Sequence, residues 1–181
     1  MLTNRPFSVL VTLLPLLMLL GCDGGGDEGE GSAGESETVG EAGIDEDAVV
    51  AQAVDYANFE QISAPAPSAH GLADTVVVWV PPAFAAEYRA VDPDDADASA
   101  AFAPGTLFVK EHLDAEGTPA GMTIMYKGPE GYDPDNGDWW WAQADVDGTL
   151  NDAGAVGYCI ACHSPREGAD WVFGIPADEQ L

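Results

Sequence analysis

The chain has 181 residues, of which 32 are Asp or Glu and 5 are Lys or Arg, so its formal net charge is -27 at pH 7. Nucleic-acid binding relies on Lys and Arg contacts to phosphates, so this charge excludes a nucleic-acid-binding protein. The charge also excludes docking on an anionic membrane without a covalent anchor. It suits a cationic partner protein or a small neutral or cationic substrate.

Residues 1–21 are predicted to be a signal peptide. An early cation, Arg5, precedes an apolar run over residues 7–20, which is shorter than the roughly 20 residues of a membrane span and is typical of a secretory signal. The run ends in Leu-Leu-Gly-Cys, which resembles a bacterial lipoprotein signal. By that resemblance Cys22 is the lipidated first residue of the mature protein, on the periplasmic face of the inner or outer membrane. The alternative is an ordinary signal peptide with an incidental cysteine.

Residues 22–47 are predicted to be a disordered tether. After Cys22 this stretch is rich in Gly and acidic residues and contains neither an aromatic residue nor a cation, so it cannot bury enough apolar surface to offset its ordering entropy. It would space a domain away from a membrane, or act as a passive solubilising tail. The remaining residues, 48–181, have the length of one domain.

The elements of this domain are predicted from periodicity and turn residues. In chain order they are an amphipathic helix over 44–59 capped by Asp45 or Asp47, a Pro-rich turn over 63–71, a buried strand over 74–80, a helix over 83–90, strands over 105–113, 121–128 and 138–146, and a helical turn over 151–162. Consecutive strands joined by short turns imply an antiparallel sheet. With helices flanking it, the predicted fold class is α+β.

The motif Cys-Ile-Ala-Cys-His lies near the C-terminal end of the chain. If lipidation accounts for Cys22, Cys159 and Cys162 are the remaining cysteines, three residues apart. Residues at this spacing lie about one helical turn apart, which suits two thioether bonds to the vinyl groups of one haem. His163 follows directly and would be the axial ligand of the iron. The motif therefore predicts one covalently bound haem c per chain.

Two other readings of the motif remain open beside a chance match. A zinc site needs about four ligands, and the chain offers His70, His112, His163 and carboxylates but no second cysteine pair. A thioredoxin-like redox pair is expected early in a βαβ fold, at a helix N-terminus, whereas this motif lies at the far end of an antiparallel domain. Export, the small number of cysteines and the adjacent histidine favour haem.

The residue opposite His163 would decide what a haem does here. A sixth protein ligand would make an electron carrier, and an open position would bind a small molecule. The candidate ligands are His70, Lys110, His112, Met122, Met125 and Lys127. Methionines in strands are more often core residues, and His112 is expected to be exposed. Lys110 lies inside a strand on the same face as Phe108, as it would in a pocket.

Four segments, taken in their order along the chain, resemble the cytochrome P-460 family of periplasmic c-type cytochromes. They read GTLFVKEH, GYDPDNGDWWWA, YCIACH and ADWVFG, and the resemblance extends to the His-Gly pair at 70–71 and the strand before Pro81. The resemblance implies a mostly β domain, a homodimer, and a haem c with an axial histidine. One departure is an arginine that enzymatic members carry on the strand before the Pro turn, where this chain reads VVVWV.

The resemblance also implies a role for Lys110. In enzymatic members a lysine in a Gly-Thr-x-x-Val-Lys-Glu stretch, which matches residues 105–111 here, is bonded to a meso carbon of the haem. Those enzymes oxidise hydroxylamine, alone or coupled with nitric oxide to give nitrous oxide, and pass electrons to a redox partner. A sister group, cytochrome c′-beta, lacks the link and binds nitric oxide or carbon monoxide. Lys110 favours the enzymatic group.

Overall fold

The computed structural model describes residues 43–69, 71–95 and 99–181. The predicted signal peptide, Cys22 and most of the predicted tether lie outside these ranges, as does His70. Among the helices of the described ranges, none is long and apolar enough to cross a membrane.

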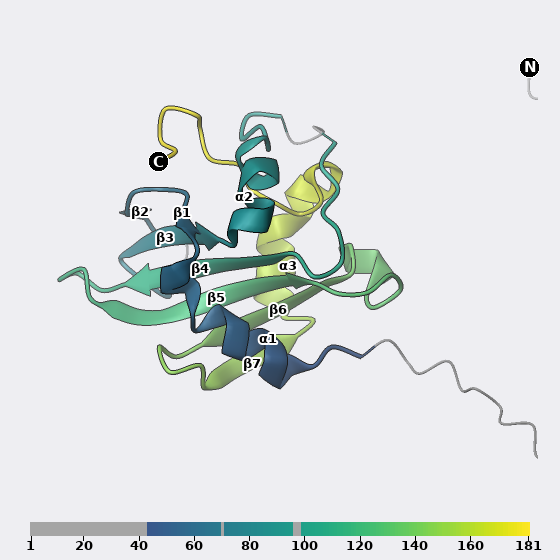
Figure 1. Cartoon of the computed structure of the whole chain (residues 1–181), viewed down its shortest axis with the longest axis horizontal. Helices are drawn as coiled ribbons and strands as arrows, with labels where there is room; N and C mark the ends of the chain where they lie inside the picture. Colours follow the sequence, from purple (N-terminus) through teal and green to yellow (C-terminus); the bar gives the residue numbers. More distant parts are fainter. Residues whose placement is uncertain (1–42, 70, 96–98) are drawn as a thin grey trace, which may run out of the picture. The chain divides into compact units, whose positions relative to one another are not determined.

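A seven-stranded antiparallel sheet forms the centre of the domain (Figure 1). Its strands are β1 (Glu60–Gln61), β2 (Ala66–Pro67), β3 (Thr75–Val80), β4 (Leu107–Leu113), β5 (Pro119–Lys127), β6 (Trp139–Ala144) and β7 (Leu150–Gly154). Their order is β1-β3-β4-β5-β6-β7, with β2 also paired to β3. The long strands β3 to β6 match the four predicted ones, and each is joined to its neighbour as an antiparallel pair.

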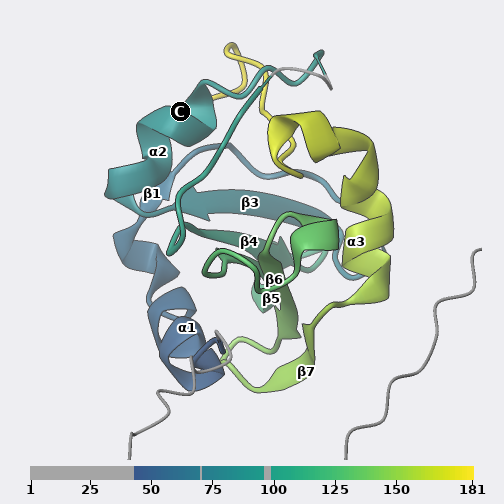
Figure 2. The same ribbon diagram turned by 90° about the vertical axis from the view of Figure 1, so that its right-hand side faces the viewer.

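Helices pack on both faces of this sheet, which confirms the α+β prediction. The helix α1 (Glu46–Ala53) packs on one face, whereas α2 (Pro82–Arg89) and α3 (Gly157–His163) pack on the other. Figure 2 shows α1 and α3 on opposite sides of the sheet. Short 3-10 turns occur at Tyr56–Asn58, Pro134–Asn136 and Ser164–Ala169.

The three consecutive tryptophans of β6 join the two faces of the sheet. Trp139 and Trp141 belong to the core under α2 and α3, and Trp140 belongs to the core under α1. All three are at most 1% exposed. This alternation follows from the two-residue period of a strand, so β6 contributes to both cores and fixes the register of the sheet.

Three predicted elements differ from the structure. Within the predicted Pro-rich turn over 63–71, Ala66–Pro67 form the short strand β2 and pair with β3. The predicted helical turn over 151–162 is wrong in its first half, because residues up to Gly154 pair with β6 as β7. Asn151 and Asp152 have low strand propensity, but the unpaired edge of β6 offers backbone hydrogen bonds that outweigh it. The predicted helix over 44–59 ends at Ala53 and is followed by a 3-10 turn.

Candidate functional site

A cavity of about 800 Å³ lies against the face of the sheet that carries α3. Side chains from β3, β4, β5, β6 and α3 line it, and the segments 63–69 and 172–181 complete its wall. The lining is mostly apolar. Both its size and its lining are typical of sites for cofactors and small molecules. The cavity brings Lys110 together with Cys159, Cys162 and His163, which are far from it in the sequence.

Helix α3 presents both motif cysteines to this cavity. Cys159 is half-buried and Cys162 is exposed, and neither is in a disulfide. Burial raises the pKa of Cys159 to about 11, and the Lys110 amine only partly opposes this effect. A redox-active cysteine pair needs a thiol whose pKa is lowered. The raised pKa of Cys159 is the opposite of what a thioredoxin-like pair needs, and both cysteines line a cofactor-sized space.

His163 is held by a hydrogen bond that suits a metal ligand. Its Nδ1 donates to the main-chain oxygen of Trp171 at 2.6 Å. Its ring also packs against Trp141 and Phe173, with ring centroids 4.8 and 5.0 Å away. Because Nδ1 carries the proton, the lone pair is on Nε2. Histidines that bind metals characteristically donate their other ring nitrogen in this way, so His163 fits the axial ligand of a haem.

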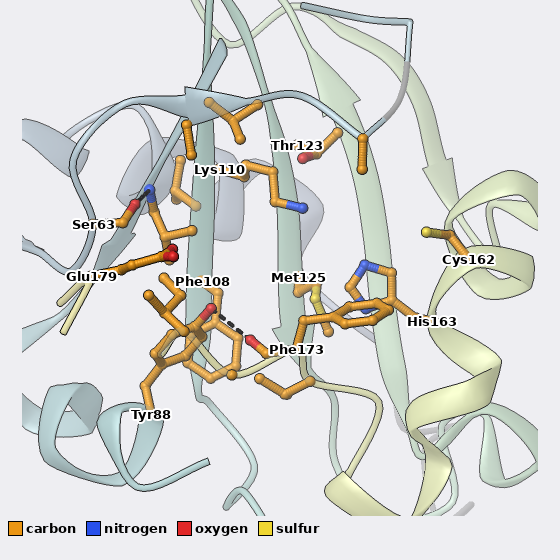
Figure 3. Close-up of a pocket in the computed structure, with 18 of the residues that line it drawn as sticks. Ser63, Tyr88, Phe108, Lys110, Thr123, Met125, Cys162, His163, Phe173 and Glu179 are labelled. Atoms are coloured by element: carbon orange, nitrogen blue, oxygen red, sulfur yellow. Dashed lines mark hydrogen bonds between the residues drawn. The ribbon is translucent and has the colours of Figure 1, made fainter. Parts of the chain in front are cut away.

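Lys110 extends from β4 into the cavity (Figure 3). In the sheet it lies between Val78 of β3 and Thr123 of β5. Burial lowers the pKa of the Lys110 amine, while the charges of Cys162 and Cys159 act in the opposite direction. A larger share of this amine is therefore neutral than for a surface lysine. A neutral amine has the lone pair needed to form a covalent bond.

The structure separates the candidate sixth ligands into two groups. Lys110 and Met125 line the cavity. Met122 is fully buried on the opposite face of the sheet, in the core under α1. Met122 is therefore an ordinary core residue and is not placed to face a haem in this cavity.

Two further candidates are engaged elsewhere. Lys127 forms an ion pair with Asp170, with Nζ 2.6 Å from Oδ1. His112 was expected to be exposed, which is wrong: it is 2% exposed and lies 3.4 Å from the Thr123 hydroxyl. Strand alternation alone could not show that neighbouring residues bury this side chain. His70 lies outside the described residues.

The segment at the C-terminal end adds residues that the sequence did not single out. Asp178 and Glu179 bring carboxylates to the cavity wall, and Figure 3 shows Glu179 across the view from His163. The strand β3 contributes Val76 and Val78 to the wall. The arginine nearest to β3 in sequence, Arg89, instead pairs with Glu60 at 2.7 Å. No sequence pattern marks residues 175–181 as part of a site.

A zinc site has no support in the described part of the chain. Within residues 43–69, 71–95 and 99–181, no three His, Cys, Asp or Glu side chains are grouped so that they could hold a metal ion. Structural zinc sites need about four such ligands. The motif cysteines and His163 therefore lack the further ligands that zinc would require there.

Comparison with known proteins supports the cofactor fit. The sequence model of the family described as Cytochrome P460 matches residues 54–174, a range that contains β3 to β7, Lys110 and the whole Cys-x-x-Cys-His motif. No match was found among curated proteins. Membership of this family implies a c-type haem cofactor. Since the match covers well over half of its length, the chain belongs to the Cytochrome P460 family.

Proposed function

We propose that this protein is an exported haem c enzyme that oxidises hydroxylamine, with Cys159 and Cys162 bonded to the haem and His163 as the axial ligand. One observation carries the proposal. Lys110 and the three functional residues of the haem motif, Cys159, Cys162 and His163, line the same cofactor-sized, mostly apolar cavity. A haem requires a buried apolar pocket. A lysine is unusual in such a pocket, because lysine side chains normally keep their charged end in water.

The two cysteines would hold the haem covalently. Each S–H adds across one vinyl C=C bond, so that a C–S bond and a C–H bond form and nothing is released. Both thiols are available for this reaction because neither is in a disulfide. His163 Nε2 would bind the iron, since Nδ1 already donates to the Trp171 carbonyl.

Lys110 would be bonded through Nζ to a meso carbon of the haem. Forming this C–N bond removes one N–H and one C–H hydrogen and releases two electrons and two protons, so an oxidant of the peroxide class must accept them. The lowered pKa of the buried Lys110 amine favours the neutral form that such a bond requires. A link of this kind would distort the macrocycle, which is one of the ways a protein tunes a haem.

The reaction would release electrons and protons that the protein must remove. When bound, the haem supplies an iron site that takes hydroxylamine and accepts its electrons. Coupling one hydroxylamine with one nitric oxide gives nitrous oxide, water, one proton and one electron, which passes to an external acceptor. Glu179 lines the cavity, and its carboxylate would take the proton. The valines of β3 and Phe108 would keep water from the reacting side.

A second candidate function is reversible binding of nitric oxide or carbon monoxide without turnover. The observation in its favour is the wall formed by β3, where Val76 and Val78 present no polar group. A third, electron transfer by a six-coordinate haem, would require Met125 or Lys110 to bind the iron, since these are the candidate sixth ligands that line the cavity in the described part of the chain.

The setting of the enzyme is also a proposal. Lipidation at Cys22 would anchor the chain to the periplasmic face of a bacterial membrane, and the tether after it would space the haem domain from it. The predicted end of the tether at residue 47 is wrong, because Asp45 caps α1 and Glu46 and Asp47 belong to this helix. The strong negative charge suits a cationic redox partner. A homodimer is proposed from the resemblance to the family.

Tryptic mapping of the haem-loaded protein tests the Lys110 link. Trypsin cleaves after Lys and Arg, so a linked haem would join residues 90–127 to residues 128–166 in one coloured fragment. We expect Lys110→Met to leave the haem on residues 128–166 alone and to abolish a strongly red-shifted ferrous Soret band. Val109→Met in the same strand is the matched control and should keep the joined fragment. Separate fragments from the wild type with a five-coordinate spectrum would favour gas binding, and a low-spin six-coordinate spectrum would favour electron transfer.

A further inference from the structure

We propose that the ion pair between Lys127 and Asp170 positions His163. The pair fixes the turn at Asp170 and Trp171, whose main-chain carbonyl accepts the hydrogen bond from His163. Lys127 is thus a positioning residue rather than a sixth ligand. This inference rests on the proposed function, because its clearest consequence concerns the bond between His163 and the haem iron.

The turn that faces His163 has an unusual backbone. Asp170 and Trp171 have φ values of 50° and 66°, and neither is glycine. Asp tolerates this left-handed region, but a residue as bulky as Trp is a genuine outlier there. Such conformations persist only where the surroundings determine them, and they gather at functional sites. Here the conformation directs the Trp171 carbonyl at His163 Nδ1, 2.6 Å away.

Hydrogen bonds to both the side chain and the main chain of Asp170 hold this turn in place. Its Oδ1 accepts from Lys127 Nζ at 2.6 Å and from Trp139 Nε1 at 3.2 Å. Its Oδ2 accepts from the main-chain N–H of Phe102 at 2.7 Å. Its main-chain oxygen accepts from Trp139 Nε1 at 3.0 Å. Asp170 therefore ties the turn to β5, to β6 and to the segment before β4.

Among these bonds, the ion pair is the one that joins two charged side chains. The side chains of Lys127 and Asp170 are only 12% and 11% exposed, so water screens their attraction less than on the surface. A charge-assisted hydrogen bond is about twice as strong as a neutral one. Lys127 also lies over the Trp139 ring, 4.8 Å from its centroid. The lysine therefore has one fixed position from which to hold the carboxylate.

Gly137 leaves space for the side chain of Trp171 in the position that this turn gives it. A Cβ at Gly137 would lie 2.7 Å from Trp171 Cδ1 and 2.9 Å from its Nε1. The indole thus fits against a glycine, and Trp171 is only 6% exposed. Both the side chain and the carbonyl of Trp171 are fixed, so the turn cannot rotate away from His163 without losing this packing.

The Asp170→Asn variant tests the inference in the haem-loaded full-length protein. Asn tolerates the left-handed conformation and keeps the size of the side chain, but it lacks the negative charge and replaces one accepting oxygen of Asp170 by an NH2 donor. A weaker bond to Nδ1 lowers the electron density on Nε2. We expect a lower iron–histidine stretching frequency in the ferrous resonance Raman spectrum and a higher reduction potential. We also expect displacement of His163 at a roughly tenfold lower imidazole concentration.

Two further variants make the test specific. Lys127→Arg keeps the cation and should retain most of the wild-type frequency, whereas Lys127→Met should behave like Asp170→Asn. The matched control is Glu60→Gln, which removes the 2.7 Å ion pair with Arg89 and should leave the frequency unchanged. Lower thermal stability of Asp170→Asn with an unchanged frequency and potential would overturn the inference.

The outcome can be separated from failure of the proposed function. The Nδ1 proton of His163, followed by nitrogen-15 NMR in the full chain with or without haem, reports the same hydrogen bond. Slow exchange of this proton in the wild type and fast exchange in Asp170→Asn would support positioning even if no haem were attached. Equal exchange in both would refute it. A wild type without covalent haem would refute the proposed function alone.

Discussion

Glu111 stands next to Lys110 in β4, but its side chain serves the other face of the sheet. It is 7% exposed, and its carboxylate accepts from the Tyr56 hydroxyl at 2.7 Å and from Trp79 Nε1 at 2.9 Å. These bonds tie the turn after α1 and the strand β3 to β4. Alternation along β4 thus separates a residue that stabilises the sheet from one that faces the cavity.

Replacing Glu111 by Ala is expected to lower the free energy of unfolding by about 2 kcal/mol, because two half-buried donors lose a charged acceptor. Urea titration at pH 7 measures the change. Glu116→Ala, at an exposed position between β4 and β5, is the matched control and should have almost no effect. Equal unfolding midpoints for the two variants would show that the Glu111 bonds do not stabilise the sheet.

Tyr88 of α2 is expected to make the free energy of unfolding fall at alkaline pH. Its ring is 5% exposed and its hydroxyl donates to the Phe173 main-chain oxygen at 2.9 Å. Burial raises the pKa of Tyr88 well above its usual range. Because the folded state holds this proton more tightly than the unfolded state, the contribution is complete below about pH 10 and is lost as the pH rises further.

The expected result for Tyr88→Phe is a loss of about 1 kcal/mol at pH 7, from the missing hydrogen bond, and a shallower loss of stability above about pH 10. Chemical denaturation at a series of pH values measures both quantities. The slope above about pH 10 should decrease by up to about 1.4 kcal/mol per pH unit, the value for one proton. An unchanged slope would mean that Tyr88 is not the group responsible.

Among the elements, the long strands could be predicted from the sequence, whereas the edge strand β7 could not. The strands β3 to β6 carry β-branched or aromatic residues in a two-residue period, so their positions and the faces of Lys110 and the β6 tryptophans followed from the sequence. The strand β7, by contrast, reads LNDAG and owes its conformation to pairing with β6. Local propensity cannot reveal a strand that exists because of its neighbour.

The candidate site was predictable to the same extent. The haem motif is local, and the position of Lys110 followed from alternation and from family resemblance. The opposite wall, formed by residues 63–69 and 172–181, has no periodicity, and these residues meet the cavity only through tertiary packing. The Trp171 carbonyl that orients His163 is a main-chain group, so no side-chain pattern could indicate it.

Helix α1 offers a test at the scale of one element. Its N-cap is Asp45, whose side chain accepts from the Ala48 N–H at 3.0 Å. We expect Asp45→Ala to lower the free energy of unfolding by about 1 kcal/mol, the usual effect of losing such a cap. Asp47→Ala, in the first turn of the same helix, is the control and should cost less. The assignment of the cap would be contradicted if the two substitutions had equal effects in urea titration.

At the scale of the whole molecule, we expect charge to govern the encounter with the proposed redox partner. With a net charge of -27, electron transfer to a cationic acceptor protein should be fast at low salt and fall at least tenfold by high salt. The Debye length decreases from about 30 Å at 0.01 M to about 3 Å at 1 M. A neutral dye as acceptor is the control, and its rate should stay nearly constant. Stopped-flow rates for the cationic protein that do not change with salt would contradict electrostatic steering.

The central claim is that the cavity holds a haem bonded to Cys159 and Cys162. Mass spectrometry of a tryptic digest, alkylated with iodoacetamide under denaturing conditions, tests it most directly. We expect the wild-type haem on residues 128–166, joined through Lys110 to residues 90–127, with neither cysteine alkylated, and no haem on residues 128–166 in Cys159→Ala/Cys162→Ala. A wild-type peptide that carries two alkylated cysteines and no haem would contradict the account.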